Sequence, residues 1–301
     1  METKYSDFIK EYAVEGDGSQ NTLTYKGFFL SPEDSLSKHC VLVLSGTSIQ
    51  LRDIQVVFDH LLKKGYAVAA IERNIGHLFN IYMHPASDRL SALKHFIRHL
   101  TQDLGVDHID IIAQSYASAE VVRALMDAPE TYTAHISSIV MVNPAGFNRS
   151  IRYLPHCLRF LFIHMLSEYV KTAWLIITCK RKGAAETKRY IRKWGALNSF
   201  FIKTLQNPAR TFREIADIVS FDIMPQLRFL LKKHGDLFYF VLNKDDTLVA
   251  VEKTLSWSQR SVPESHILVF PGNHLDSFID ENQILLISEL IDKINNRVIH
   301  A

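Results

Sequence analysis

The sequence predicts an α/β protein with a mostly parallel central sheet that is covered by helices on both faces. Continuous apolar runs such as residues 40–44 are typical of strands that are buried on both faces of a parallel sheet. These runs alternate with segments of helical period along most of the chain, as in strand–helix–strand units with right-handed crossovers. The alternation therefore indicates one large sheet with helices packed on each side.

The composition permits one large core, or one core with an inserted subdomain, because 47% of the 301 residues are hydrophobic. The formal net charge is only +2, so no overall positive field points to a nucleic acid as partner. Cys40, Cys157 and Cys179 are odd in number and far apart, which suits a reducing compartment rather than a disulfide framework or a zinc site. Residues 1–17 contain no apolar signal segment, so we expect a cytoplasmic protein.

The order of the elements follows from the change between apolar runs and helical periods. Strands are expected at 23–30, 40–44, 66–71, from 108 to the turn at Ser115, and at 136–143, 237–242 and 266–270. Helices are expected at 52–64, 87–104, from just after Ser115 to about 127, and at 249–258 and 280–296. Gly65 directly follows the first helix and is expected to end it in a left-handed conformation.

One stretch has the pattern of a strand, a tight turn and a helix with a serine at the apex. The run His108–Ile112 is followed by the small and polar residues Ala113-Gln114-Ser115-Tyr116-Ala117, and a helical period begins at once. Such a turn strains the backbone of its central residue and leaves room only for small side chains two positions away. The alternative is that Ser115 is an ordinary helix N-cap residue after a buried strand.

Side chains that could activate Ser115 follow two later strands. In a parallel sheet the carboxyl ends of the strands meet at one edge, which is where reactive groups gather. Asp245 and Asp246 follow strand 237–242, and His274 follows strand 266–270. A serine becomes a nucleophile when a histidine takes its proton, and a carboxylate must hold that histidine in the correct tautomer. The spacing to Val249 favours Asp246, which leaves Asp245 as a solvated loop carboxylate.

The chain resembles the α/β-hydrolase superfamily from about residue 23 onward. The resemblance rests on the order of Ser115, Asp246 and His274, and on the stretches Ser45-Gly46-Thr47, Ala113–Ala117, Asp246–Val249 and Gly272–His274. It implies that Ser115 is the nucleophile, His274 the base and Asp246 the orienting acid. It also implies an oxyanion hole made by the backbone N–H groups of Thr47 and Tyr116.

Two departures from the usual hydrolase pattern narrow the resemblance. Alanines flank Ser115 where the family usually has glycines, and Ser45 stands where it usually has a histidine. In these features the chain is similar to the acyl-ACP thioesterases and acyltransferases that feed bacterial luciferase systems. That similarity implies an esterase or thioesterase that acts on a hydrophobic acyl group through an acyl-enzyme. There are two alternatives. The chain could be an acyltransferase that forms the same acyl-enzyme, or a non-catalytic relative that binds a ligand.

An insertion is expected to divide the hydrolase domain. Residues 1–147 and 221–301 would form the core, and residues 148–220 a helical cap with 14 Lys or Arg and 4 Asp or Glu. Residues 157–178 of the cap are apolar nearly all round, which predicts the roof of a pocket or a helix in a membrane interface. No apolar run approaches the ~20 residues of a membrane-spanning helix.

The cap also contains a cluster of basic residues, which we call the basic patch: Lys180, Arg181, Lys182, Lys188, Arg189, Arg192 and Lys193. One interpretation is a solvated helical face. The other is that the patch recruits an anionic carrier of the acyl chain, either an acidic acyl carrier protein or an anionic membrane surface that the protein contacts peripherally. His77 lies in the loop after a strand, where a structural role in a turn is favoured over catalysis. The scattered histidines show no metal-ligand spacing, and the chain has no phosphate loop or dinucleotide fingerprint, so we expect no metal and no cofactor.

Overall fold

We describe the fold from a computed structural model of the chain. It describes residues 8–15, 22–32, 38–46, 51–72, 86–127, 133–147, 163, 166–179, 184–206, 208–209, 222–246, 248–249 and 251–299. All structural statements below concern these residues.

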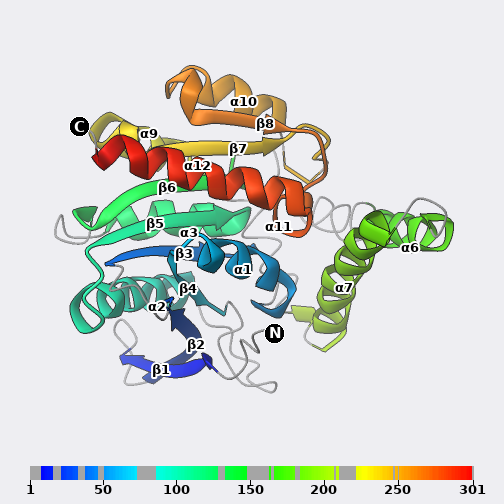
Figure 1. Ribbon diagram of the computed structural model, residues 1–301, viewed down its shortest axis with the longest axis horizontal. Helices are drawn as coiled ribbons and strands as arrows, with labels where there is room; N and C mark the ends of the chain where they lie inside the picture. Colours follow the sequence, from blue (N-terminus) through cyan, green and yellow to red (C-terminus); the bar gives the residue numbers. More distant parts are fainter. Residues whose placement is uncertain are drawn as a thin grey trace.

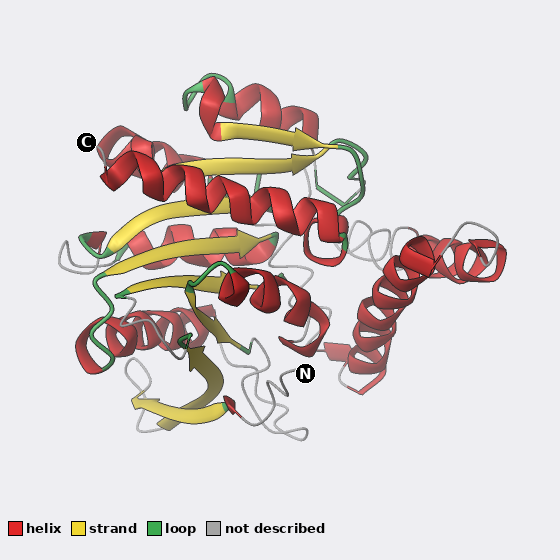
Figure 2. Ribbon diagram, viewed as in Figure 1, coloured by secondary structure: helices red, strands yellow, loops and turns green. Residues whose placement is uncertain are grey.

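An eight-stranded sheet forms the centre of the molecule (Figure 2). Along the sheet the strands are β1 (Lys10–Glu15), β2 (Thr22–Leu30), β4 (Ala67–Ile71), β3 (His39–Leu44), β5 (His108–Gln114), β6 (Ile136–Val142), β7 (Phe238–Asn243) and β8 (Ile267–Phe270). The pairs β1–β2 and β2–β4 are antiparallel, and the neighbours from β4 to β8 are all parallel. The prediction of a mostly parallel sheet is therefore confirmed.

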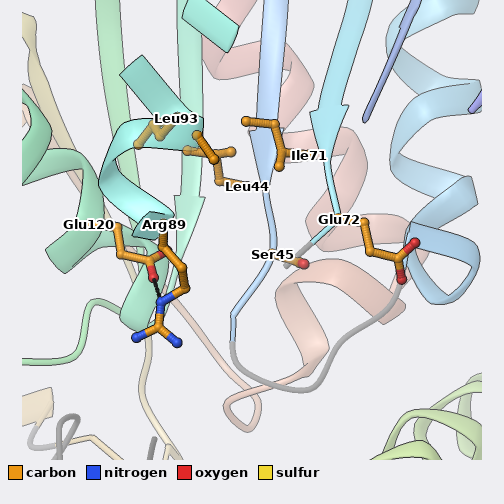
Figure 3. A pocket seen from close by; sticks show the side chains of 8 residues that line it. Leu44, Ser45, Ile71, Glu72, Arg89, Leu93 and Glu120 are labelled. Carbon is orange, nitrogen blue, oxygen red and sulfur yellow. Dashed lines mark ion pairs between the residues drawn. The ribbon is translucent and has the colours of Figure 1, made fainter. Parts of the chain in front are cut away.

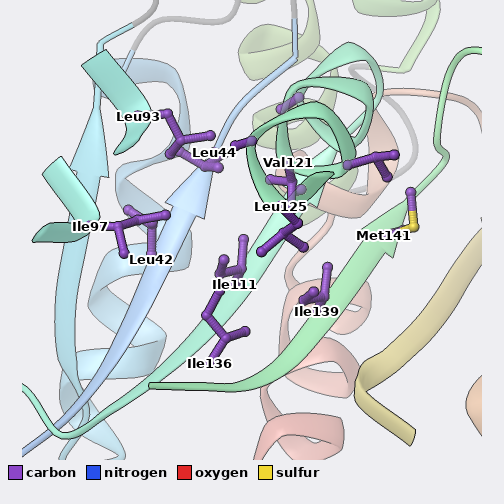
Figure 4. Close-up of a cluster of buried hydrophobic side chains, with 14 of the residues drawn as sticks. Leu42, Leu44, Leu93, Ile97, Ile111, Val121, Leu125, Ile136, Ile139 and Met141 are labelled. Atoms are coloured by element: carbon purple, nitrogen blue, oxygen red, sulfur yellow. The ribbon is translucent and has the colours of Figure 1, made fainter. Parts of the chain in front are cut away.

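Helices cover both faces of this sheet (Figure 1). One face carries α2 (Ala86–Arg98), α3 (Tyr116–Met126), α9 (Met224–His234) and α10 (Val251–Ser258). The other carries α1 (Gln55–Lys63), α11 (Asp276–Ile279) and α12 (Glu281–Ile299). Because side chains alternate along a strand, Leu42 of β3 packs in the first layer, whereas Val41 packs in the second. Figure 4 shows the first of these two cores, with Leu42 and Ile111 of the sheet beneath Val121 and Leu125 of α3.

The structure differs from the prediction at the ends of several elements. The sheet begins one strand earlier than expected, with β1, which contains three charged residues, Lys10, Glu11 and Glu15. An edge strand tolerates such charges, and the ring of Tyr12 stacks on Tyr25 of β2 with centroids 5.2 Å apart.

The helix expected at 87–104 ends with a π-helical turn over His99–Asp103. Gly65 has φ +87°, which confirms its predicted left-handed conformation.

Two helices between β6 and β7 belong to the expected insertion. They are α6 (Leu166–Cys179) and α7 (Ala184–Gln206), which pack on one another and project away from the sheet (Figure 1). Of the apolar segment 157–178, residues 157–162 and 164–165 lie outside the described part of the chain. Among the described helices none is both long and apolar enough to cross a membrane.

Candidate active site

Ser115 sits at a strained turn between β5 and α3. Its φ of 55° and ψ of −122° lie where L-residues rarely occur, and the fold over-determines this conformation. Its N–H donates to the carbonyl of Val142 at 2.8 Å, and its own carbonyl accepts from the N–H groups of Ser118 and Ala145, each at 3.1 Å. Ala113 is fully buried, as is Ala117, so a larger side chain at either position would need space that the turn lacks.

The hydroxyl of Ser115 does not cap the helix that follows it. Ser115 occupies the N-cap position of α3, yet its side chain makes no capping hydrogen bond to that helix. An N-cap serine normally accepts a bond from the second or third helical N–H. The interpretation of Ser115 as an ordinary cap therefore does not fit, and its side chain is available for chemistry.

His274 and Asp246 form a buried pair at the same edge of the sheet. The Nδ1 of His274 lies 2.6 Å from Oδ2 of Asp246. The other carboxylate oxygen, Oδ1, accepts the backbone N–H groups of Leu248 at 2.8 Å and Val249 at 3.1 Å. Because both oxygens of Asp246 are engaged, the carboxylate cannot rotate, and it holds the imidazole with Nε2 directed away from Asp246.

Asp245 has a different role from its neighbour. Its Oδ2 accepts the backbone N–H of Gly272 at 3.0 Å, and its own N–H donates to the carbonyl of Gly272 at 3.0 Å. Asp245 thus fastens the loop after β8, which carries His274. The expectation that Asp245 is a merely solvated carboxylate was incomplete, because this exposed side chain also holds a loop in place.

Two buried amides that sequence reasoning did not single out connect the loops of the site. Gln114 donates to the carbonyl of His274 at 3.3 Å and accepts the N–H of Gly46 at 3.3 Å. Asn143, at the carboxyl end of β6, donates to the same carbonyl at 3.2 Å. Since Gln114 directly precedes Ser115, it connects the loop that carries His274 and the loop after β3 to the turn at Ser115. A polar residue at the end of an apolar strand is the signal that both amides share.

The structure describes one of the two residues of the expected oxyanion hole, Tyr116. Tyr116 is the first residue of α3, and the N-terminus of a helix carries a positive partial charge that favours an anion. Thr47 lies outside the described residues, but Gly46 before it approaches Ser115 closely. A Cβ atom on Gly46 would lie 3.0 Å from Cβ of Ser115. The loop after β3 therefore passes directly beside the candidate nucleophile.

A small hollow opens beside this loop (Figure 3). Apolar side chains from β3, β4 and α2 form most of its wall, with an ion pair at one side. The lining consists of Leu44, Ser45, Ile71, Glu72, Arg89, Ala92, Leu93 and Glu120. Nε of Arg89 lies 3.0 Å from Oε1 of Glu120, and the guanidinium lies 5.6 Å from the ring centroid of Tyr116.

The described residues of the basic patch are largely paired within the molecule. Arg189 contacts Oδ2 of Asp276 at 2.8 Å, Arg192 contacts Glu281 at 3.0 Å, and Lys193 contacts Glu168 at 2.7 Å. Lys188 is exposed. Lys180, Arg181 and Lys182 lie outside the described residues, as does His77. No group of three or more potential metal ligands occurs within the described ranges.

Solved structures of known proteins are similar to the whole chain in fold. A bromoperoxidase from Bacillus anthracis matches 93% of this chain and 99% of its own, with a TM-score of 0.61 and 16% identity. An esterase from Exiguobacterium antarcticum matches 91% and 96%, with a TM-score of 0.61 and 13% identity. A haloalkane dehalogenase from Paraglaciecola agarilytica matches 93% and 91%, with a TM-score of 0.62 and 13% identity. No model of a protein family matches the sequence, and no curated protein does.

Proposed function

The chain has the α/β-hydrolase fold, and on that premise we propose that it is a serine hydrolase that cleaves an ester or thioester of a hydrophobic acyl group. The observation that carries the proposal is the buried pair of His274 and Asp246 at the sheet edge where Ser115 sits on its strained turn. Similar structures that include an esterase, a lipase and a phospholipase support hydrolysis as the reaction class.

The contacts of the site support a double-displacement mechanism. Asp246 occupies Nδ1 of His274, which leaves Nε2 to take the proton of Ser115 as its Oγ attacks the acyl carbonyl. The N–H groups of Thr47 and Tyr116 would stabilise the negative charge that develops on the carbonyl oxygen. The imidazolium then donates its proton to the leaving alcohol or thiol, and an acyl-enzyme forms on Ser115. Water, deprotonated by His274, releases the acid and regenerates the serine.

The hollow beside Ser45 supports a hydrophobic acyl group as the part of the substrate that is recognised. Leu44, Ile71 and Leu93 give it apolar walls, and it lies next to the loop that approaches Ser115. The ion pair of Arg89 and Glu120 lies at its side, and this pairing keeps their charges from opposing an apolar ligand.

The experiment that tests the proposal is labelling with a fluorophosphonate probe, which reacts only with an activated serine. We expect the wild-type protein to be labelled and the Ser115→Ala variant to be unlabelled. Ser137→Ala is the matched control, because Ser137 lies near the opposite end of the parallel strands, where it contacts His108, and its loss should leave labelling unchanged. Labelling that survives in Ser115→Ala would exclude Ser115 as the nucleophile, and absence of any labelling would favour a ligand-binding protein.

A screen of p-nitrophenyl esters and coenzyme A thioesters of graded chain length would then define the acyl group. The chain length at which hydrolysis is fastest would show how much of the acyl group the protein recognises. Addition of an alcohol, amine or thiol acceptor distinguishes the two outcomes of the acyl-enzyme, since a transferase forms a new ester, amide or thioester at the expense of the free acid. Arg189, Arg192 and Lys193 of the basic patch are paired within the molecule, so we propose that its other residues bring an anionic acyl carrier, an acyl carrier protein or an anionic membrane, to this site.

A further inference from the structure

Exposed apolar side chains gather on the two helices that project from the sheet. Among the described residues fifteen large apolar side chains are exposed, and more than half of them lie within residues 163–206. These are Ile163, Leu166, Val170, Trp174, Ile177, Ile191, Ile202 and Leu205. A group of exposed apolar side chains of this size marks a surface at which a protein contacts a partner protein, a ligand or a membrane.

On α6 these side chains form one continuous stripe. Leu166, Val170, Trp174 and Ile177 follow one another at steps of four, four and three residues, so they share one face of the helix. Their exposed fractions are 44%, 59%, 62% and 72%, and the exposure therefore rises toward the end of α6. We call these four residues the α6 stripe.

The packing of α6 against α7 does not use the α6 stripe. Tyr169 stacks on Trp194 with ring centroids 4.0 Å apart and meets the ring of Phe201 edge-on at 4.9 Å. Thr172 is fully buried, and Glu168 pairs with Lys193 at 2.7 Å. These residues make up the interior of the helix pair, so the α6 stripe is left for a contact outside it.

The charge around the stripe selects an anionic partner. Residues 163–206 contain nine Lys or Arg and two Asp or Glu, and three of the nine, Arg189, Arg192 and Lys193, are paired with carboxylates within the molecule. Lys171 is mostly exposed within α6, and the sequence continues after α6 with Lys180-Arg181-Lys182. A second copy of the chain that covered the stripe by twofold symmetry would bring these positive charges together, which opposes such a dimer.

We propose that the α6 stripe docks on the surface of an anionic lipid layer, with α6 lying in the plane of the interface. An apolar face with an exposed tryptophan, flanked by basic residues, is the composition of a helix that binds at the headgroup boundary. The stripe lies on a helix that projects from the body of the protein (Figure 1), where a flat lipid surface can reach it. This docking rests on the proposed function in one respect, because it identifies the anionic carrier of the acyl group as a membrane. Binding to the membrane itself requires no catalysis.

The test measures vesicle binding in the Ser115→Ala background, so that lipid turnover plays no part. Vesicles of phosphatidylcholine with phosphatidylserine are compared with vesicles of phosphatidylcholine alone, by flotation and by tryptophan emission. We expect binding to the anionic vesicles, a decrease of this binding with salt, and a blue shift of emission that Trp174→Phe abolishes. Joint substitution of Val170, Trp174 and Ile177 by Gln should weaken binding by more than about tenfold.

Two further variants keep the result interpretable. Phe229→Gln removes an equally exposed apolar side chain from α9, away from the stripe, and should leave vesicle binding unchanged. Lys171→Gln with Lys188→Gln leaves the stripe intact and should weaken binding to anionic vesicles only. Failure of the wild-type chain to bind anionic vesicles, or equal binding by the triple variant, would overturn the proposal, and binding to an acyl carrier protein alone would do the same. Vesicle binding without fluorophosphonate labelling would reject the proposed hydrolase and leave the docking surface standing.

Discussion

Replacing Arg189 by glutamine should loosen α7 from the loop that carries His274. The guanidinium of Arg189 lies 2.8 Å from Oδ2 of Asp276 and 3.2 Å from Oδ2 of Asp280. Asp276 also accepts the backbone N–H of Asn273 at 2.7 Å, which places this carboxylate directly beside His274 in the same loop. Burial lowers the pKa of Arg189, but the negative charges of Asp276 and Asp280 outweigh this and raise the pKa, so the guanidinium stays charged.

The size of the effect follows from the burial of the two partners. The side chain of Asp276 is 1% exposed, whereas that of Arg189 is 30% exposed. Removing one partner of a fully buried ion pair costs about 3–5 kcal/mol, because the remaining charge is left without compensation. Water can reach the position of Arg189 and replace part of its contact. We therefore expect Arg189→Gln to lower the free energy of unfolding by about 1–3 kcal/mol.

Urea denaturation of matched variants measures this loss. Arg192→Gln is the control, because Arg192 lies on the same helix but pairs with Glu281, whose side chain is 61% exposed. An exposed pair contributes about 0–1 kcal/mol, so this variant should change little. Asp276→Asn in the Arg189→Gln background should cost less than it does alone. Equal stability of the two arginine variants would refute the assignment of Arg189 as the link between α7 and the histidine loop.

Three other predictions concern the site and the core. Asp246→Asn should lower kcat by about 10³–10⁴ and Asp245→Asn by less than about tenfold; the reverse order in a kinetic assay would show that the acid was misassigned. Ala117→Gly should keep turnover, whereas Ala117→Val should abolish turnover or folding, and an active valine variant would argue against the strained turn. Burial lowers the pKa of His95, so below about pH 6.5 the unfolded chain binds more protons than the folded chain, and stability decreases as the pH is lowered. His95→Gln should make the melting temperature depend less on pH in this range. An unchanged pH dependence would contradict this prediction.

The strands of the parallel sheet and the turn at Ser115 could be predicted because their signals are local. Each buried strand is a short apolar run, and the residues around Ser115 follow one another in the chain. The edge strand β1 escaped prediction because its charged residues are tolerated where one side of the strand faces solvent. Its place in the sheet depends on pairing with β2 rather than on its own composition.

The supports of the site could not be predicted because their partners are distant in sequence. Gln114 and Asn143 bond the carbonyl of His274 from 160 and 131 residues away. The sequence places Arg189 in the basic patch, yet its partner Asp276 lies 87 residues further along the chain. Composition reveals the charge of such a residue, but only the fold decides whether that charge is neutralised.

The measurement that tests the central claim most directly is the turnover of Ser115→Ala, His274→Ala and the double variant on one reactive ester. Because the two residues act as a unit, we expect each single variant to lose about 10⁴–10⁶ in kcat and the double variant to lose little more. Thermal melts should show that all three remain folded. Near-normal turnover by Ser115→Ala, or losses that multiply in the double variant, would contradict a serine nucleophile activated by His274.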